Sequence, residues 1–371
     1  MKVVTIVGTR PELIKLSRSI PLLDQNFEHI LIHTGQNYDY ELNEIFFKEL
    51  KIRKPDYFLN IKSSTPLKSI GNMIIKLDDI LDKIKPDCGI IYGDTNSCLS
   101  AIALKKKKIP IFHLEAGNRS FDENVPEEVN RRIIDHISDI NIVLTEHARR
   151  YLILEGIRPD FVIKTGSFMK EVLHSKIKEI NKSKILTKLK LKKKNYLLFS
   201  FHREENVDNH KKLKEIISTI IMLSKTLKMK CIVSTHPRTR LQLNKIKISN
   251  ISNVIFLKPM GFFDYNHLQM NSYCTLSDSG TITEESDILN FPAITIRTSH
   301  ERPEGMDAGT LIMSGVSKEN VFRSINYVCK NFKNFQRDKV QDYLTENASD
   351  KLIKVILSYT DLVNKRIWFK E

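Results

Sequence analysis

Three carboxylates stand where apolar runs of strand length end in the first half of the chain. Asp94 follows the run at 88–92, Glu115 follows the run at 109–114, and Glu127 follows a proline at the start of a helical pattern. Acidic groups in such loops add little to a core but can meet a ligand, and general acid–base catalysis needs them in a cleft. Asp94 and Glu127 could instead cap helix N-termini, where negative charge is favourable. Three together indicate proton-transfer chemistry.

Cationic residues follow other apolar runs. After the first run, Gly8 permits a tight turn and the start of a helix presents backbone donors, which predicts that Arg10 and Lys15 lie near a phosphate. Alternatively, Gly8 has only a structural role, because glycine often precedes a helix. In the second half, His202 and His236 each stand beside an arginine after a run, where imidazolium and guanidinium groups can hold a diphosphate.

The segment 276–285 is the most informative one in the second half. A strand pattern ends in the turn Ser279-Gly280 and a helical pattern begins, so the helix amides and the serine hydroxyl can cradle a phosphate. One helical turn further on, Glu285 could accept hydrogen bonds from both ribose hydroxyls. A capping box would explain the serine and glutamate types equally well.

Apolar runs of strand length alternate with amphipathic segments of helix length, which is typical of parallel βαβ units. We expect strands at 3–7, 29–33, 88–92, 109–114, 140–144 and 162–165, and again at 196–201, 231–235, 254–257, 274–277 and 293–296. The pattern predicts an α/β protein with two Rossmann-like domains facing a central cleft, where such sheets bind ligands. The predicted domains are 1–167 and 168–350, followed by a C-terminal helix at 351–371 that packs back across both.

Composition narrows the class of protein. A chain of 371 residues with a net charge of +15 could bind anionic partners, but its lysines are scattered and no nucleic-acid module appears. No apolar run is long enough to span a membrane, which predicts a cytoplasmic protein. The five cysteines lack paired spacing, no metal-ligand cluster is evident, and no Gly-x-Gly-x-x-Gly turn follows a strand, so we expect neither metal nor nicotinamide.

Taken together, these loops resemble the non-hydrolysing UDP-N-acetylglucosamine 2-epimerase family, which has the two-domain GT-B fold. The matching blocks, in family order, are Gly8-Thr9-Arg10-Pro11-Glu12, His33-Thr34-Gly35-Gln36, Gly93-Asp94-Thr95-Asn96-Ser97, His113-Leu114-Glu115-Ala116-Gly117, Pro126-Glu127-Glu128-Val129-Asn130-Arg131, His202-Arg203-Glu204-Glu205-Asn206, Asp278-Ser279-Gly280 and His300-Glu301-Arg302-Pro303-Glu304. Each block is weak alone, whereas the ordered set is highly specific.

The resemblance implies a cofactor-independent epimerase that eliminates UDP with the proton at carbon 2, holds a glycal, and adds UDP back after protonating the opposite face. It implies that Asp94, Glu115 and Glu127 are the acid and base candidates, without deciding which removes the proton, and that Arg131 orients them. It also implies that Arg10, Lys15, His202, Ser279 and Gly280 hold the UDP diphosphate, with His202 counted among the catalytic residues, and that Glu285 binds the ribose; His236 is expected to bind the diphosphate from its place after a strand. Members are commonly homodimers, so a homodimer is expected.

Within the family, the chain looks most like the branch that makes UDP-N-acetyl-L-fucosamine from UDP-2-acetamido-2,6-dideoxy-L-talose, for capsule or O-antigen synthesis. Three stretches carry this likeness: 118–122, 202–206 and 261–265. The alternative substrate is UDP-N-acetylglucosamine, which would give UDP-N-acetylmannosamine.

Fold alone does not fix function, so rival activities stay open. A GT-B glycosyltransferase would need an acceptor, a hydrolysing epimerase would release UDP and free sugar, and a nucleotide-sugar sensor would leave the carbon 2 proton unexchanged. Incubation with the UDP-sugar alone separates them.

Overall fold

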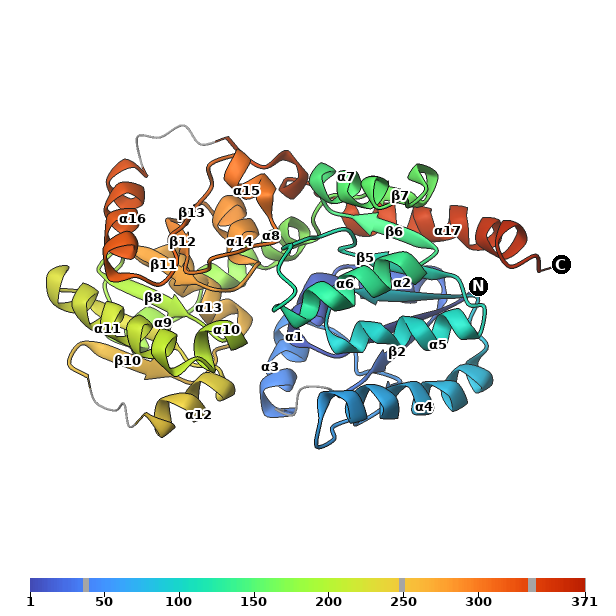
Figure 1. Cartoon of the computed structure of the whole chain (residues 1–371), viewed down its shortest axis with the longest axis horizontal. Helices are drawn as coiled ribbons and strands as arrows, with labels where there is room; N and C mark the ends of the chain where they lie inside the picture. The colour runs from blue at the N-terminus through green and yellow to red at the C-terminus, as the bar shows by residue number, and fades with distance from the viewer. Residues whose placement is uncertain (36–39, 247–250, 333–337, 371) are drawn as a thin grey trace. The chain divides into compact units, whose positions relative to one another are not determined.

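The computed structural model describes residues 1–35, 40–246, 251–332 and 338–370, so Gln36 of the second matching block lies outside it. Contacts divide the chain into unit 1, Met1–His174 with Gln341–Glu371, and unit 2, Ser175–Val340 (Figure 1). The sequence predicted a boundary after 167, and this division falls seven residues later, inside helix α8 (Met169–Asn181).

Within the described residues, unit 1 contains a seven-stranded sheet of order β3-β2-β1-β4-β5-β6-β7, and each neighbouring pair is parallel. The strands are β1 (Lys2–Val7), β2 (Glu28–His33), β3 (Tyr57–Phe58), β4 (Cys88–Tyr92), β5 (Ile111–Leu114), β6 (Ile140–Val143) and β7 (Val162–Lys164). The helices are α1 (Arg10–Leu16), α2 (Ser19–Asn26), α3 (Tyr40–Leu50), α4 (Pro66–Ile84), α5 (Ala101–Lys106), α6 (Pro126–Ile137), α7 (Glu146–Leu154), the first part of α8, and α17 (Ala348–Arg366).

The residues that form the core of unit 1 follow from the pattern of apolar residues along its strands and helices. The strands β1 and β4 are apolar along nearly their whole length because helices cover both faces of a parallel sheet. Helix α4 is amphipathic, and its buried residues Met73, Leu77 and Leu81 pack with Val4 and Ile6 of β1. Burial of this stripe fixes the sheet that carries the loops at its carboxyl edge.

Unit 2 repeats the arrangement, with a six-stranded parallel sheet of order β10-β9-β8-β11-β12-β13 among the described residues. Its strands are β8 (Tyr196–Ser200), β9 (Lys230–Ser234), β10 (Val254–Leu257), β11 (Cys274–Ser277), β12 (Ala293–Thr295) and β13 (Ile312–Met313). Its helices, after α8, are α9 (Ile185–Lys188), α10 (Glu204–Val207), α11 (His210–Thr226), α12 (Pro237–Lys245), α13 (Phe262–Asn271), α14 (Ile282–Leu289), α15 (Pro303–Asp307) and α16 (Lys318–Asn331). Two Rossmann-like α/β units confirm the predicted fold class.

The C-terminal helix α17, which the sequence predicted to pack back across the domains, is grouped with unit 1. It packs against α2, where the hydroxyls of Ser349 and Ser19 lie 3.0 Å apart. Trp368 follows the helix end, and the Lys105 ammonium lies 4.9 Å from its ring centroid. Both chain termini therefore lie in unit 1.

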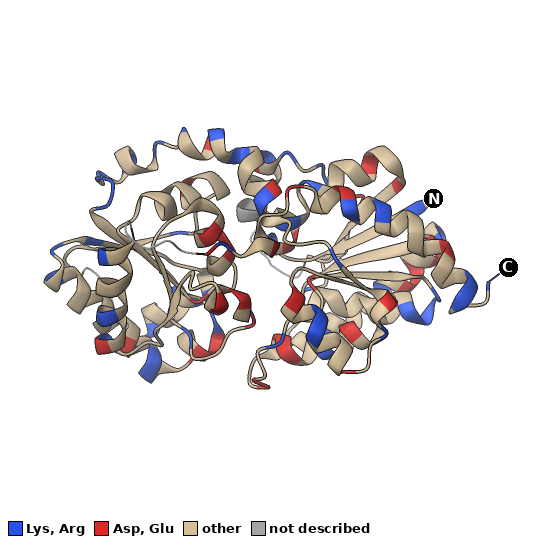
Figure 2. Cartoon of the chain, turned by 90° about the horizontal axis from the view of Figure 1, so that it is seen from above, with Lys and Arg blue, Asp and Glu red and all other residues tan. Residues whose placement is uncertain are grey.

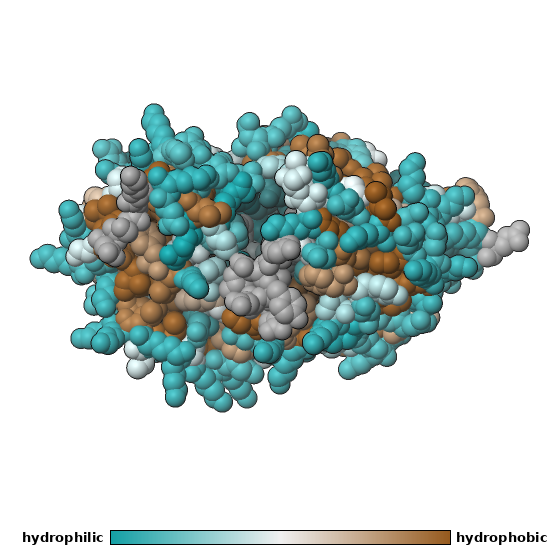
Figure 3. Space-filling model, turned by 90° about the horizontal axis from the view of Figure 1, so that it is seen from below, coloured by the Kyte–Doolittle hydropathy of each residue, from teal (hydrophilic) through white to brown (hydrophobic). Residues whose placement is uncertain are grey.

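The surface carries both signs of charge. In Figure 2, the positions of basic and acidic residues alternate along the helices of both units. Figure 3 shows one face of the molecule, on which hydrophilic side chains surround smaller hydrophobic areas. Across the described ranges, every helix is too short or too polar to cross a bilayer.

Candidate active site

The candidate residues of each unit follow the central strands of its sheet. In unit 1 they follow β1, β4 and β5, and in unit 2 they follow β8, β9 and β11. In both sheets the strand order reverses direction beside the first strand, between β1 and β4 and between β8 and β11. Open parallel sheets bind ligands outside the strand ends at such a switch point. Each unit therefore carries its candidate residues at the edge of its sheet where such ligands bind.

Asp94 is held by Arg131 of helix α6. The Arg131 Nε donates to Asp94 Oδ2 at 2.8 Å, and Nη1 donates to Glu128 Oε2 at 2.8 Å. The Glu128 side chain is fully buried and also accepts from the amide and hydroxyl of Ser120, both at 2.9 Å. Burial raises the pKa of Glu128, but hydrogen bonds from Ser120 and Arg131 outweigh it, so the pKa is lowered. Arg131 thus joins one candidate acid to a buried carboxylate.

Glu115 is paired with Lys15 of helix α1. The Lys15 ammonium donates to Glu115 Oε2, and both side chains are largely buried. The same ammonium lies 5.1 Å from the Tyr92 ring centroid. Glu115 has φ 65°, a left-handed conformation that is uncommon outside glycine. Such conformations are concentrated at functional sites, where the surrounding structure enforces them.

Glu12 links the loops after β1 and β4. It accepts from the Gly8 amide at 2.6 Å, the Thr9 hydroxyl at 2.9 Å and the Thr95 hydroxyl at 2.6 Å. Burial raises the pKa of Glu12 to about 6, although these hydrogen bonds oppose the rise. A Cβ on Gly8 would collide with the Ser97 hydroxyl, so glycine is required where the two loops meet.

The other two predicted residues of unit 1 lie in first turns of helices. Arg10 begins α1, and its guanidinium carbon lies 5.5 Å from the Phe46 ring centroid of α3. Glu127 is in the first turn of α6 and is partly exposed. The dipole of a helix favours negative charge at its N-terminus, as with Glu127 in α6, and an anion bound at the N-terminus of α1 would lie close to Arg10.

In unit 2, Asp278 organises the loop that bears His202. The buried Asp278 carboxylate accepts from the amides of His202 and Arg203 at 3.0 Å and from the Asn206 side chain at 3.1 Å. The His202 ring is partly exposed, with Nδ1 at 3.3 Å from the same carboxylate. This loop is therefore fixed to the end of β11.

His236 lies beside His202, with the two ring centroids 5.6 Å apart. It is the N-cap of α12, and its Nδ1 accepts from the Arg238 amide at 3.3 Å. The Arg238 guanidinium pairs with Glu204 and, at 2.6 Å, with Asp208. The loops after β8 and β9 thus converge, as expected for residues that contact one anion.

The turn Ser279-Gly280 leads into α14. The Ser279 hydroxyl lies 3.0 Å from the Thr281 hydroxyl. A Cβ on Gly280 would collide with Glu301 Oε1, and Glu301 Oε2 accepts from buried Arg297 at 2.7 Å. Glu301 thus packs against Gly280 on the side where a Cβ would lie, so a larger residue would displace the Glu301 carboxylate.

Glu285 lies in the first turn of α14 and accepts from Gln269 of α13 at 2.6 Å. It is partly exposed. An ionised carboxylate has about four lone-pair positions and can accept from several donors at once.

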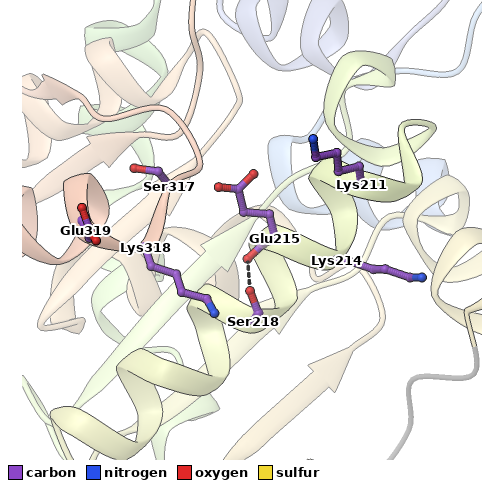
Figure 4. Close-up of a pocket in the computed structure, with 7 residues that line it drawn as sticks. All are labelled: Lys211, Lys214, Glu215, Ser218, Ser317, Lys318 and Glu319. Carbon is purple, nitrogen blue, oxygen red and sulfur yellow. Dashed lines mark hydrogen bonds between the residues drawn. The ribbon is translucent and has the colours of Figure 1, made fainter.

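The described residues hold no group of three or more histidine, cysteine, aspartate or glutamate side chains that could bind a metal ion. A hollow on unit 2, at the starts of α11 and α16, is lined by none of these candidate residues (Figure 4). Its lining is Lys211, Lys214, Glu215, Ser218, Ser317, Lys318 and Glu319.

Comparison with known proteins assigns the chain to a family. The model of the family described as UDP-N-acetylglucosamine 2-epimerase matches residues 22–357. The chain belongs to this family. A UDP-N-acetylglucosamine 2-epimerase homolog of Methanococcus maripaludis is 41% identical over 333 residues, which cover 88% of this chain and 92% of that protein.

Solved structures of the family agree with this fold. The UDP-N-acetylglucosamine 2-epimerase of Rickettsia bellii is 52% identical with a TM-score of 0.93, and the match covers 100% of both chains. The Methanocaldococcus jannaschii enzyme, solved with UDP-GlcNAc and UDP, is 35% identical with a TM-score of 0.90, covering 97% of this chain and 100% of that one. Family membership confirms the predicted enzyme class, a non-hydrolysing UDP-sugar 2-epimerase.

Three residues beside the candidate site residues were not themselves predicted. Glu12, Glu128 and Asp278 each stand inside a matching block, but each also binds a residue outside that block: Thr95, Ser120 and His202, respectively. A buried acidic residue next to a candidate ligand-binding residue is the one signal that could have suggested them. Arg131, expected to orient several carboxylates, contacts Asp94 and Glu128.

Proposed function

We propose that this enzyme inverts carbon 2 of a UDP-linked N-acetylamino sugar by elimination and re-addition of UDP. The observation that carries the proposal is that unit 1 presents Asp94 and Glu115 at adjacent strand ends, each paired with a buried cation. Two acids in different electrostatic surroundings suit opposite proton transfers on the two faces of one carbon.

The reaction needs no cofactor in this scheme. One carboxylate takes the carbon 2 proton, the C1–O bond breaks with its electrons passing to UDP, and a C1=C2 double bond forms. A second acid then protonates carbon 2 from the opposite face, and a phosphate oxygen of UDP adds back to carbon 1. Asp94, Glu115 and Glu127 are the candidates for these transfers, with Arg131 holding Asp94 in place.

Charge grows on the departing diphosphate, so preorganised donors there contribute most to the rate. We assign this role to His202, His236 and the amides after Ser279-Gly280 in unit 2, with Arg10 and Lys15 in unit 1. The convergence of the two histidine loops supports the assignment. Glu285 is proposed to bind the ribose hydroxyls, which its partly exposed position allows.

The first candidate substrate is UDP-2-acetamido-2,6-dideoxy-L-talose. The stretch 202–206 has Glu204 where UDP-N-acetylglucosamine epimerases usually have arginine, and here Glu204 pairs with Arg238 of the neighbouring loop. UDP-N-acetylglucosamine is the second candidate, and the names of the similar proteins favour it. The product would serve capsule or O-antigen synthesis in the cytoplasm, and we propose a homodimer, which analytical ultracentrifugation tests.

The test is incubation of the enzyme with each UDP-sugar alone, followed by NMR of the anomeric signals. An epimerase brings one or both sugars to an equilibrium mixture with intact UDP linkage. Release of free sugar and UDP would point instead to hydrolysis, and no change without an added acceptor would point to a glycosyltransferase. The relative kcat/KM of the two sugars identifies the substrate.

A further inference from the structure

A buried histidine–aspartate pair lies beneath the candidate acids of unit 1. His113 is on β5 and Asp135 is on α6, and both are fully buried. The His113 Nδ1 lies 2.8 Å from Asp135 Oδ1, and Nε2 donates to the Gly93 carbonyl at 2.8 Å. The ring therefore lies between a buried carboxylate and a backbone carbonyl, both of which are acceptors.

Asp135 has further partners. It accepts from the Gly117 amide at 3.2 Å and from Arg119 Nη1 at 2.7 Å. Arg119 Nη2 in turn donates to Glu155 Oε2 at 2.6 Å. Burial raises the pKa of Asp135, but contacts from His113 and Arg119 outweigh it and lower the pKa.

These contacts reach all three elements that carry the candidate acids. Gly93 directly precedes Asp94, and Gly117 ends the turn that begins at Glu115. Asp135 itself stands one helical turn after Arg131, on the helix whose first turn contains Glu127. A single buried pair therefore contacts the loop after β4, the loop after β5 and helix α6.

We propose that the His113–Asp135 pair is a positioning device that fixes Asp94, Glu115 and Glu127 relative to one another for proton transfer at carbon 2. This rests on the proposed function. Two chemical features support it. A buried charged pair is costly unless well compensated and is often no better for stability than apolar packing. Catalytic groups, in contrast, need a supporting shell that holds them within about 0.5 Å.

The test compares Asp135→Asn with Asp139→Asn. Asp139 is also a buried aspartate of unit 1, and it accepts from Lys105 at 2.6 Å and from the Ile111 amide at 2.9 Å. It contacts the opposite end of β5, where no candidate acid lies. The two substitutions remove the same charge from similarly buried sites, so a difference between them reports position rather than burial.

We expect Asp135→Asn to lower kcat about 100-fold with an unchanged KM for the UDP-sugar and an unchanged Kd for UDP, because misplacement of about 1 Å has this effect. Asp139→Asn is expected to keep the wild-type kcat. Assays are run well below the Tm of each variant. Equal kcat in Asp135→Asn and wild type, or an equal fall in both variants, would overturn the proposal.

Two substitutions of His113 keep the test decisive if Asp135→Asn does not fold. In His113→Asn the amide nitrogen can replace Nδ1 and keep the aspartate contact, and in His113→Gln it can replace Nε2 and keep the Gly93 contact. Each breaks one half of the link, so each is expected to lower kcat while KM stays constant. Wild-type kcat in both would refute positioning. A wild-type protein inactive on both UDP-sugars would refute the proposed function instead.

Discussion

Replacing Arg131 with methionine should destabilise unit 1 through the buried carboxylate that the arginine leaves behind. The side chain of Glu128 is fully buried, and Arg131 is its ion-pair partner at 2.8 Å. Breaking a buried pair from one side typically costs about 3–5 kcal/mol. In the variant, Glu128 keeps its hydrogen bonds from the Ser120 amide and hydroxyl, and water can solvate the partly exposed Asp94. We therefore take the lower end of this range, about 3 kcal/mol.

We therefore expect Arg131→Met to lower the free energy of unfolding of unit 1 by about 3 kcal/mol, which corresponds to roughly 6–12 °C in Tm. The chain has one tryptophan, Trp368, and it lies in unit 1. Its fluorescence during urea unfolding of the whole protein consequently reports on unit 1, and far-UV circular dichroism reports on both units.

A double-mutant cycle with Glu128→Gln tests the cause. The glutamine is neutral, so removing Arg131 in that background should cost only about 1 kcal/mol, giving a coupling energy of about 2 kcal/mol. Costs that add to within about 0.5 kcal/mol would refute the reasoning, because they would mean that the buried charge of Glu128 does not depend on Arg131.

Three further predictions concern single residues. The folded pKa of Glu12 is about 6 against an ordinary 4.5, so the folded state holds this proton more tightly and loses stability as the proton dissociates. The stability of the wild type relative to Glu12→Gln should fall by about 1.3 kcal/mol as pH rises from 4.5 to 6; denaturation at both pH values checks this, and a constant difference contradicts it. Glu115→Gly should have a free energy of unfolding about 1 kcal/mol higher than Glu115→Ala, because glycine accepts φ 65° without strain. Urea denaturation measures the difference, and equal midpoints would contradict the left-handed backbone at this position. Gly280→Ala should raise the Kd for UDP about tenfold or more in calorimetry, about 1.4 kcal/mol, because the added Cβ meets Glu301. Gly71→Ala serves as the control, because a Cβ there meets nothing within 4 Å, and equal Kd values in the two variants would remove Gly280 from the site.

The fold could be predicted because its strands are buried on both faces and therefore appear as continuous apolar runs. Cys88–Tyr92, Val254–Leu257 and Cys274–Ser277 were predicted to the residue. The two-residue edge strands Tyr57–Phe58 and Ile312–Met313 were missed, since two residues show no periodicity.

The loops that carry candidate residues could also be predicted, because carboxyl ends of parallel strands share one edge of a sheet. The partners of these residues could not. Lys15 was expected near a phosphate, but it is paired with Glu115, which is distant in sequence, and this depends on the tertiary packing of α1 against the sheet. The left-handed backbone of Glu115 likewise has no local sequence signal, because glutamate rarely adopts it.

The central claim is that acids of unit 1 exchange the proton at carbon 2 of a UDP-sugar. Incubation in deuterated water with wild type, Asp94→Asn, Glu115→Gln and Glu127→Gln, followed by NMR of carbon 2, tests it most directly. We predict deuterium at carbon 2 of the product in wild type and loss of exchange in at least two of the variants, with UDP still bound. Epimerisation that retains the original proton, or full exchange in all three variants, would contradict it.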